Sequence, residues 1–188
     1  MLTLINPPGL KSFSGLQMHV PNPPLGLAYI AAAVREAGFD CHVVDGTGEA
    51  LDDIHSYPGR ADFLMQGLKL EDIVARIPRA SEIIGITCMF STLWPLTRKL
   101  AELVREAFPD ALLILGGEHG TAVHDHVLRT SPFDVIVLGE GEQTIVDILQ
   151  TVAEGKSVAS VSGVAYRDGA ETVSNGLSAR ARDVDAIP

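Results

Sequence analysis

Small and polar residues gather where successive apolar segments of the chain end. Asn6-Pro7-Pro8-Gly9 follows the first apolar segment, Ser91-Thr92-Leu93 follows the third, and Gly116-Gly117 ends the fourth. Parallel strands of an open α/β sheet present their carboxyl ends at one edge, where such sheets bind ligands. Glycines there let a phosphate or a planar group approach the backbone, because no Cβ is in the way. The pattern therefore predicts a ligand site at that edge.

Hydroxyl, imidazole and carboxylate groups accompany these glycines. Ser91 and Thr92 either cap the first turn of a helix or contact the ligand. His119, in Gly116-Gly117-Glu118-His119, is either a loop histidine bonded to backbone or a cofactor contact. Gly139-Glu140-Gly141-Glu142 repeats the glycine pattern one strand further on. Its two carboxylates would repel a phosphate, so they favour hydroxyl groups or a cation instead.

Composition limits the classes of function. The chain has 188 residues, 46% of them hydrophobic, and a formal net charge of -10, which suits one domain with a short extension and argues against a nucleic-acid partner. No apolar run approaches the ~20 residues needed to cross a bilayer, so no membrane partner is expected. Cys41 and Cys88 lie in apolar segments, as buried thiols do in a reducing compartment. A cytoplasmic protein is expected.

Five short apolar runs predict parallel strands, because they are continuous rather than alternating and so suit a sheet covered on both faces. They span residues 2–5, 41–44, 83–87, 112–115 and 135–138. Helical patterns lie between them, with apolar residues at i, i+3, i+4 and i+7. The predicted fold is α/β: a flavodoxin-like (Rossmann-like) open parallel sheet of five strands in the order 2-1-3-4-5, with helices on both faces.

Three segments depart from this alternation. The first connection, residues 6–24, is far longer than a usual βα loop and carries five prolines. Residues 46–68 form an insertion interpreted as a surface excursion. Beyond Gly155, Asp168-Gly169 between two apolar runs predicts a β-hairpin. The predicted organisation is an α/β domain over 1–155, followed by a hairpin and linker over 156–188.

Taken together, these segments resemble the B12 (cobalamin)-binding domain at the front of cobalamin-dependent radical S-adenosylmethionine (SAM) enzymes. Ser91-Thr92-Leu93 and Gly116-Gly117 resemble the SxL and GG signatures of cobalamin-binding domains. The other resembling pieces are Asn6-Pro7-Pro8, the segment 23–32, Gly85-Ile86-Thr87 and 138–142. Residues 163–167 and 185–188 resemble the bridge to the radical SAM domain.

The resemblance implies base-off cobalamin, with the dimethylbenzimidazole tail entering a pocket of the sheet and the first loop beside the corrin. The residues it implies as cofactor contacts are Asn6, Pro7, Pro8, Leu25, Gly26, Thr87, Ser91, Thr92, Leu93, Gly116, Gly117, Glu118, His119, Gly139, Glu140 and Gly141. No residue of this chain is expected to be catalytic or to ligate a metal.

Cobalt ligation departs from the usual cobalamin-binding pattern. The DxHxxG segment that often carries the cobalt-ligating histidine is replaced by Asn6-Pro7-Pro8, so cobalamin without a protein lower ligand is expected. His19 is the one histidine of the first loop and stands as the alternative ligand. The chain has no CxxxCxxC motif, so a [4Fe-4S] cluster and SAM are expected only in a downstream domain of a longer chain.

The leading interpretation is therefore the cofactor module of a methyltransferase or cyclase, not catalytic alone. A freestanding or degenerate module that senses cobalamin or docks a partner is the alternative. An FMN-binding flavodoxin is a third reading, which the prolines after the first strand disfavour because they replace its hydroxyl-rich phosphate loop.

Overall fold

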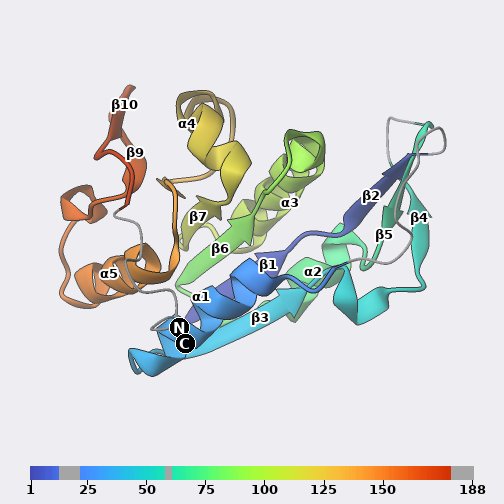
Figure 1. The fold of residues 1–188 in the computed structure, drawn as a ribbon, viewed down its shortest axis with the longest axis horizontal. Coiled ribbons are helices and arrows are strands. Elements are labelled where there is room, and N and C mark those ends of the chain that lie inside the picture. The colour runs from blue at the N-terminus through green and yellow to red at the C-terminus, as the bar shows by residue number, and fades with distance from the viewer. Residues whose placement is uncertain (13–21, 58–60, 179–188) are drawn as a thin grey trace.

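The computed structural model describes residues 1–12, 22–57 and 61–178; His19 and the segment 185–188 lie outside these ranges. The chain forms a central seven-stranded sheet in the order β10-β9-β8-β7-β6-β1-β3 (Figure 1). Five neighbouring strands of this sheet, β8, β7, β6, β1 and β3, are parallel. Their bounds are β1 Leu2–Asn6, β3 Cys41–Asp45, β6 Ile83–Thr87, β7 Leu112–Gly116 and β8 Val135–Val137. The α/β class with a mostly parallel sheet is confirmed.

The predicted hairpin belongs to the same sheet. Its strands, β9 (Val164–Asp168) and β10 (Glu171–Ser174), are antiparallel, and β9 pairs antiparallel with β8. Val164 and Ala165 are fully buried by this pairing. The sheet therefore has seven strands where the sequence indicated five, because the hairpin covers an edge that β8 would otherwise expose.

Five helices cover the two faces of the sheet: α1 Leu25–Glu36, α2 Leu70–Arg76, α3 Trp94–Ala107, α4 Glu118–Thr130 and α5 Glu142–Ala153. One apolar cluster joins the sheet to α1 and α5, through residues such as Leu27, Val34 and Ile148. A second cluster joins the opposite face to α2, α3 and α4, through residues such as Ile73 and Leu100. The sheet thus separates two apolar layers. Single turns of 3-10 helix, η1 Gly48–Ala50, η2 Ser91–Leu93 and η3 Val158–Ser160, complete the helical segments.

A second, three-stranded antiparallel sheet projects beyond the carboxyl ends of β1 and β3 (Figure 1). Its order is β2-β5-β4, with β2 Gly9–Ser12, β5 Phe63–Gln66 and β4 Ile54–Ser56. Buried Met65 and Leu68 pack it against the α2 layer. The first loop and the insertion at 46–68, both interpreted as irregular from the sequence, together form this sheet.

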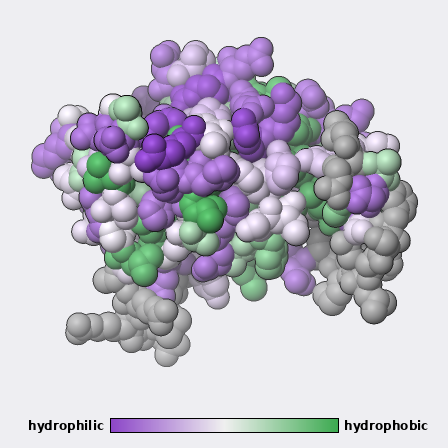
Figure 2. Space-filling view, turned by 90° about the horizontal axis from the view of Figure 1, so that it is seen from above, coloured by the Kyte–Doolittle hydropathy of each residue, from purple (hydrophilic) through white to green (hydrophobic). Residues whose placement is uncertain are grey.

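The surface carries both hydrophilic and hydrophobic side chains. In the view of Figure 2, hydrophilic side chains cover most of the upper half, and hydrophobic ones form separate small groups. Among the helices described, none is long and apolar enough to cross a membrane.

Candidate functional site

An inner groove opens at the carboxyl ends of β6, β7 and β8 and runs beneath α1 and α5. Its volume is about 250 Å³, and its walls are mostly apolar. Eight of the residues expected as cofactor contacts line it: Gly26, Thr87, Gly116, Gly117, Glu118, Gly139, Glu140 and Gly141. The sequence prediction of a site at this edge of the sheet therefore corresponds to a real hollow.

An outer groove of about 530 Å³ adjoins the inner one. It lies between the ends of β1 and β6 and the second sheet. Six expected residues line it: Asn6, Pro7, Pro8, Gly26, Thr87 and Leu93. Gly26, Thr87 and Met89 belong to both grooves, which makes the two continuous.

The two adjacent glycines at the end of β7 play different parts. A Cβ on Gly116 would meet no atom within 4 Å, so a side chain there would extend into the inner groove. Gly117 has a φ of +98°, and a Cβ there would lie 2.6 Å from the carbonyl oxygen of Cys88. Gly116 therefore keeps the groove open, whereas Gly117 is required by the fold itself.

Hydrogen bonds fix the exit of β1. The Asn6 amide donates to a carboxylate oxygen of Asp45 at 2.8 Å, and the backbone N–H of Thr47 donates to the same oxygen at 3.2 Å. The Thr47 hydroxyl donates to the carbonyl of Pro7 at 3.0 Å. Asn6 thus lines the outer groove with one N–H of its amide donated to Asp45, and Asp45 and Thr47 are the partners that sequence reasoning missed.

Ser91 and His119 come together although 28 residues separate them in sequence. His119 Nδ1 lies 2.9 Å from Ser91 Oγ, and the imidazole ring packs against Trp94 with ring centroids 4.8 Å apart and a tilt of 33° between the rings. The backbone N–H of His119 donates to the carbonyl of Cys88. His119 is 7% exposed, and burial lowers its pKa, with the neighbouring His126 adding to that effect. It is a buried helix residue rather than a loop histidine bonded only to backbone.

Four of the expected residues do not line either groove: Leu25, Ser91, Thr92 and His119. Leu25 is instead 63% exposed at the start of α1. Apolar lining residues that sequence reasoning left out include Leu27, Ile30, Met89 and Ile114. The sequence signal for Met89 was its place in the pair Met89-Phe90 shortly after an apolar strand, and the structure leaves both side chains about half exposed or more.

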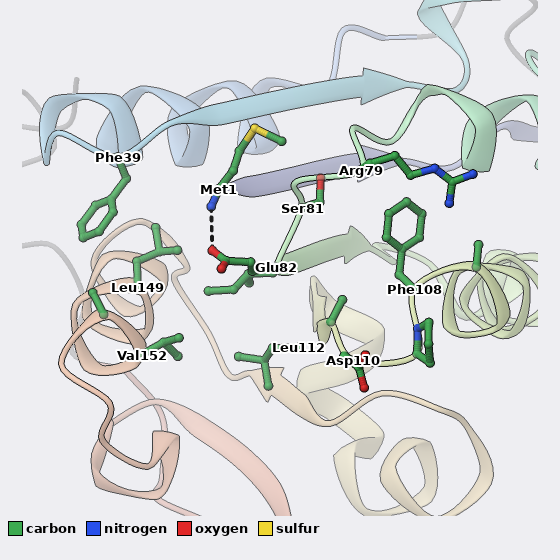
Figure 3. Close-up of a pocket in the computed structure, with 15 residues that line it drawn as sticks. Met1, Phe39, Arg79, Ser81, Glu82, Phe108, Asp110, Leu112, Leu149 and Val152 are labelled. Carbon is green, nitrogen blue, oxygen red and sulfur yellow. Dashed lines mark hydrogen bonds and ion pairs between the residues drawn. The ribbon is translucent and has the colours of Figure 1, made fainter.

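A third hollow lies at the opposite edge of the sheet, beyond the amino ends of the strands (Figure 3). It measures about 760 Å³ and contains none of the expected residues. The amino group of Met1 and the carboxylate of Glu82 form an ion pair at 3.2 Å across it. Over the ranges that the structure covers, no group of three or more His, Cys, Asp or Glu residues is placed to hold a metal ion.

Comparison with known families decides the class of the chain. A family model described as B12 binding domain matches residues 16–149, well over half of the sequence. The chain belongs to the B12-binding domain family. The adjoining grooves at the carboxyl edge of the sheet are therefore those of a B12-binding domain.

Curated relatives of this B12-binding domain are much longer proteins. It is 31% identical over 170 residues to the anaerobic magnesium-protoporphyrin IX monomethyl ester cyclase of Cereibacter sphaeroides, covering 88% of this chain and 25% of the relative. It is 30% identical over 146 residues to the cytidylyl-2-hydroxyethylphosphonate methyltransferase of Streptomyces wedmorensis, covering 77% of this chain and 27% of the relative. The chain thus spans about a quarter of the length of these relatives.

Solved structures share the fold of this B12-binding domain. The radical S-adenosylmethionine methyltransferase TsrM from Kitasatospora setae, with cobalamin and a [4Fe-4S] cluster bound, superposes with a TM-score of 0.68 at 18% identity. The match covers 100% of this chain and 30% of that one. The cobalamin-dependent S-adenosylmethionine radical enzyme OxsB with aqua-cobalamin and S-adenosylmethionine bound gives a TM-score of 0.68 at 16% identity, over 95% of this chain and 22% of that one.

Proposed function

We propose that this B12-binding domain holds cobalamin across its two adjoining grooves and serves as the cofactor module of a longer radical SAM enzyme. The observation that carries the proposal is the open face of Gly116, where a backbone without a Cβ lines an apolar groove at the carboxyl edge of the sheet. Ligands of open α/β sheets bind at this edge.

The residues present fit such a cofactor. The inner groove is narrow and apolar, which suits the flat dimethylbenzimidazole of a base-off tail. The outer groove is wider and carries polar side chains, among them Lys11, Thr47 and Gln66, which suit the amide groups around a corrin ring. We therefore assign the tail to the inner groove and the ring to the outer one, with Gly26 and Thr87 beside both.

The donor set also bears on cobalt ligation. The residues that line the outer groove include no histidine within the described part of the chain, and the Asn6 amide donates to Asp45. Imidazole is the side chain most often used to ligate such a metal. We therefore propose base-off cobalamin without a protein nitrogen on its lower face. His19, the alternative ligand, lies outside the described residues.

The rest of the chemistry belongs to the remainder of a longer protein. Methylcobalamin supplies a methyl group that can be transferred, and the radical half of such an enzyme needs an iron–sulfur cluster bound by cysteines in a CxxxCxxC motif, which this chain lacks. We propose that the cluster and SAM reside in a domain following residue 188, that the enzyme acts in methyl transfer or ring formation, and that it is cytoplasmic. The proposed organisation keeps an α/β domain over residues 1–155 and a hairpin and linker over 156–188, with the hairpin joined to the domain as two edge strands of the same sheet.

Reconstitution tests the proposal. The chain is incubated with hydroxocobalamin, passed through gel filtration and examined for a corrin absorption spectrum in the protein fraction. Wild type is expected to retain corrin, whereas Gly116→Val, which fills the inner groove, is expected to lose it with an unchanged circular dichroism spectrum. Ala122→Val, on the exposed surface of α4, is the matched control and should behave as wild type.

Two outcomes would contradict this assignment. Equal retention of corrin by wild type and Gly116→Val would mean that the tail does not bind in the inner groove. A wild-type chain that retains no corrin would favour the degenerate docking module instead.

A further inference from the structure

A strap formed by residues 175–178 follows the hairpin and packs against the loop 138–141, which joins β8 to α5. The first residue of the strap is fixed to the segment before β9, because the Asn175 amide donates to the carbonyls of Ala159 and Val161 at 2.8 and 2.7 Å. The family model for B12 binding ends at residue 149, so the strap lies outside the part of the chain that it matches.

Ser178, the last residue of the strap, holds the loop by its backbone and by its hydroxyl. Its N–H donates to the carbonyl of Leu138 at 3.1 Å. Its Oγ lies 3.1 Å from that carbonyl oxygen and 2.9 Å from the carbonyl oxygen of Glu140. The Ser178 hydroxyl therefore bridges the two carbonyls on either side of Gly139.

Two glycines make room for Ser178. Gly139 has a φ of +83°, and a Cβ there would lie 3.1 Å from Ser178 Oγ. Gly163 has a φ of +75°, and a Cβ there would lie 2.8 Å from Ser178 Cβ. Gly139 also lines the inner groove, so the same residue contacts both the strap and the groove.

Thr121 provides a second anchor for the loop. The backbone N–H of Gly139 donates to Thr121 Oγ1 at 3.1 Å, and this hydroxyl lies 3.4 Å from the carbonyl oxygen of Gly117. Thr121 belongs to α4, within the part of the chain that the family model matches. The strap differs from it in one respect, because it connects the loop to the part of the chain that continues toward residue 188.

We propose that the strap positions the loop 138–141 at the inner groove, so that anchoring of the strap and binding of the cobalamin tail stabilise each other. This inference rests on the proposed function, which assigns the tail to the inner groove and a further domain to the chain beyond residue 188. Coupling between two sites is reciprocal: if an anchored strap favours the bound tail, a bound tail favours an anchored strap by the same factor. Loading of the cofactor is thereby communicated to the start of the linker. Ser178 is assigned no contact with the cofactor.

Binding of two corrinoids separates this role from a structural one. Cobinamide has the corrin ring of cobalamin and lacks the nucleotide tail. Gly139 and Glu140 line the inner groove, and neither is among the described residues that line the outer one. Ser178→Ala removes the bridging hydroxyl and should therefore weaken cobalamin binding roughly threefold to tenfold while leaving the dissociation constant of cobinamide unchanged.

Ser160→Ala is the matched control. It removes another hydroxyl that donates to a backbone carbonyl, that of Ser157 at 2.9 Å, in the exposed turn η3. Neither groove is lined by Ser160. Both dissociation constants should equal those of wild type.

Amide hydrogen exchange of the wild-type chain tests the coupling without any variant. The Ser178 N–H reports anchoring directly, because it donates to the carbonyl of Leu138. Saturating cobalamin should slow the exchange of this amide roughly threefold or more, and saturating cobinamide should leave it unchanged. This measurement decides the question even if Ser178→Ala proves unstable.

The failure of this inference and that of the proposed function can be told apart. If wild type binds cobalamin but Ser178→Ala loses affinity for cobalamin and cobinamide equally, or for neither, the strap does not position the loop for the tail. The same holds if cobalamin binds without slowing exchange of the Ser178 amide. A wild-type chain that binds neither corrinoid would overturn both the inference and the proposed function.

Discussion

The carbonyl oxygen of Cys88 lies 2.6 Å from the point where a Cβ on Gly117 would stand. Two hydrogen bonds hold this approach, from Cys88 N–H to the carbonyl of Gly116 at 2.8 Å and from His119 N–H to the carbonyl of Cys88 at 3.1 Å. The segment leaving β6 therefore presses on the turn into α4. The fold therefore requires glycine at position 117 whether or not a ligand is bound.

Gly117→Ala is accordingly expected to destabilise the protein. A φ of +98° disfavours any side chain, and the added methyl group also meets the Cys88 backbone. The free energy of unfolding should fall by about 1–3 kcal/mol, the range for strained backbone and overpacking. Urea unfolding followed by circular dichroism measures the change. Unaltered stability would mean that the segment at Cys88 moves aside freely.

Stability should depend on pH through His119. Burial lowers its pKa below the ordinary 6.5, so the unfolded chain takes up a proton first as pH falls. The contribution of neutral His119 is complete above about pH 6.5 and is lost as pH falls toward the lowered value. The stability difference between wild type and His119→Asn should therefore shrink between about pH 7.5 and pH 5.5. A constant difference in urea unfolding across that range would contradict a buried neutral imidazole.

Arg105 is expected to stabilise the end of α3. Its guanidinium donates to the carbonyls of Pro109, Ala111 and Pro132 and pairs with Asp134. Arg105→Met leaves these acceptors without their donor and should lower the free energy of unfolding by about 1–3 kcal/mol. Arg98→Met, on the same helix with one exposed partner, is the matched control and should change little. If Arg105→Met and Arg98→Met lower the free energy of unfolding equally, in thermal or urea unfolding, Arg105 does not stabilise the end of α3.

Electron paramagnetic resonance tests cobalt ligation. Cob(II)alamin bound to this chain should give a spectrum without the triplet splitting that a coordinated nitrogen causes, because the outer groove offers no histidine among its described lining residues. Triplets that persist in wild type and disappear in His19→Ala would show instead that the first loop supplies the ligand.

Continuous apolar runs made the parallel strands predictable from sequence, since a strand such as Ile83–Thr87 is buried on both faces and has few other ways to fold. The glycine and proline segments likewise indicated which edge of the sheet carries the grooves. Both inferences depend on patterns within a single short segment.

The features that escaped prediction depend on contacts between distant segments. β2 and β5 are short and partly exposed. β2 pairs with β5 across more than fifty residues, and β5 lies between β2 and β4. The hydrogen bond between His119 and Ser91 is of the same kind, because neither residue carries a local signal of its partner. Hydrophobic periodicity in a sequence indicates which side chains are buried, but it does not indicate which distant segments pair with one another.

The division of the core into two layers has a further consequence. The inner groove is lined by residues of the apolar layer that joins the sheet to α1 and α5, such as Leu27, Ile114 and Ile145. Among the described residues of the layer under α2, α3 and α4, Ile86 alone lines the groove. A molecule bound in the inner groove would add contacts mainly to the apolar layer under α1 and α5. Binding would therefore make that layer more rigid than the layer on the opposite face of the sheet.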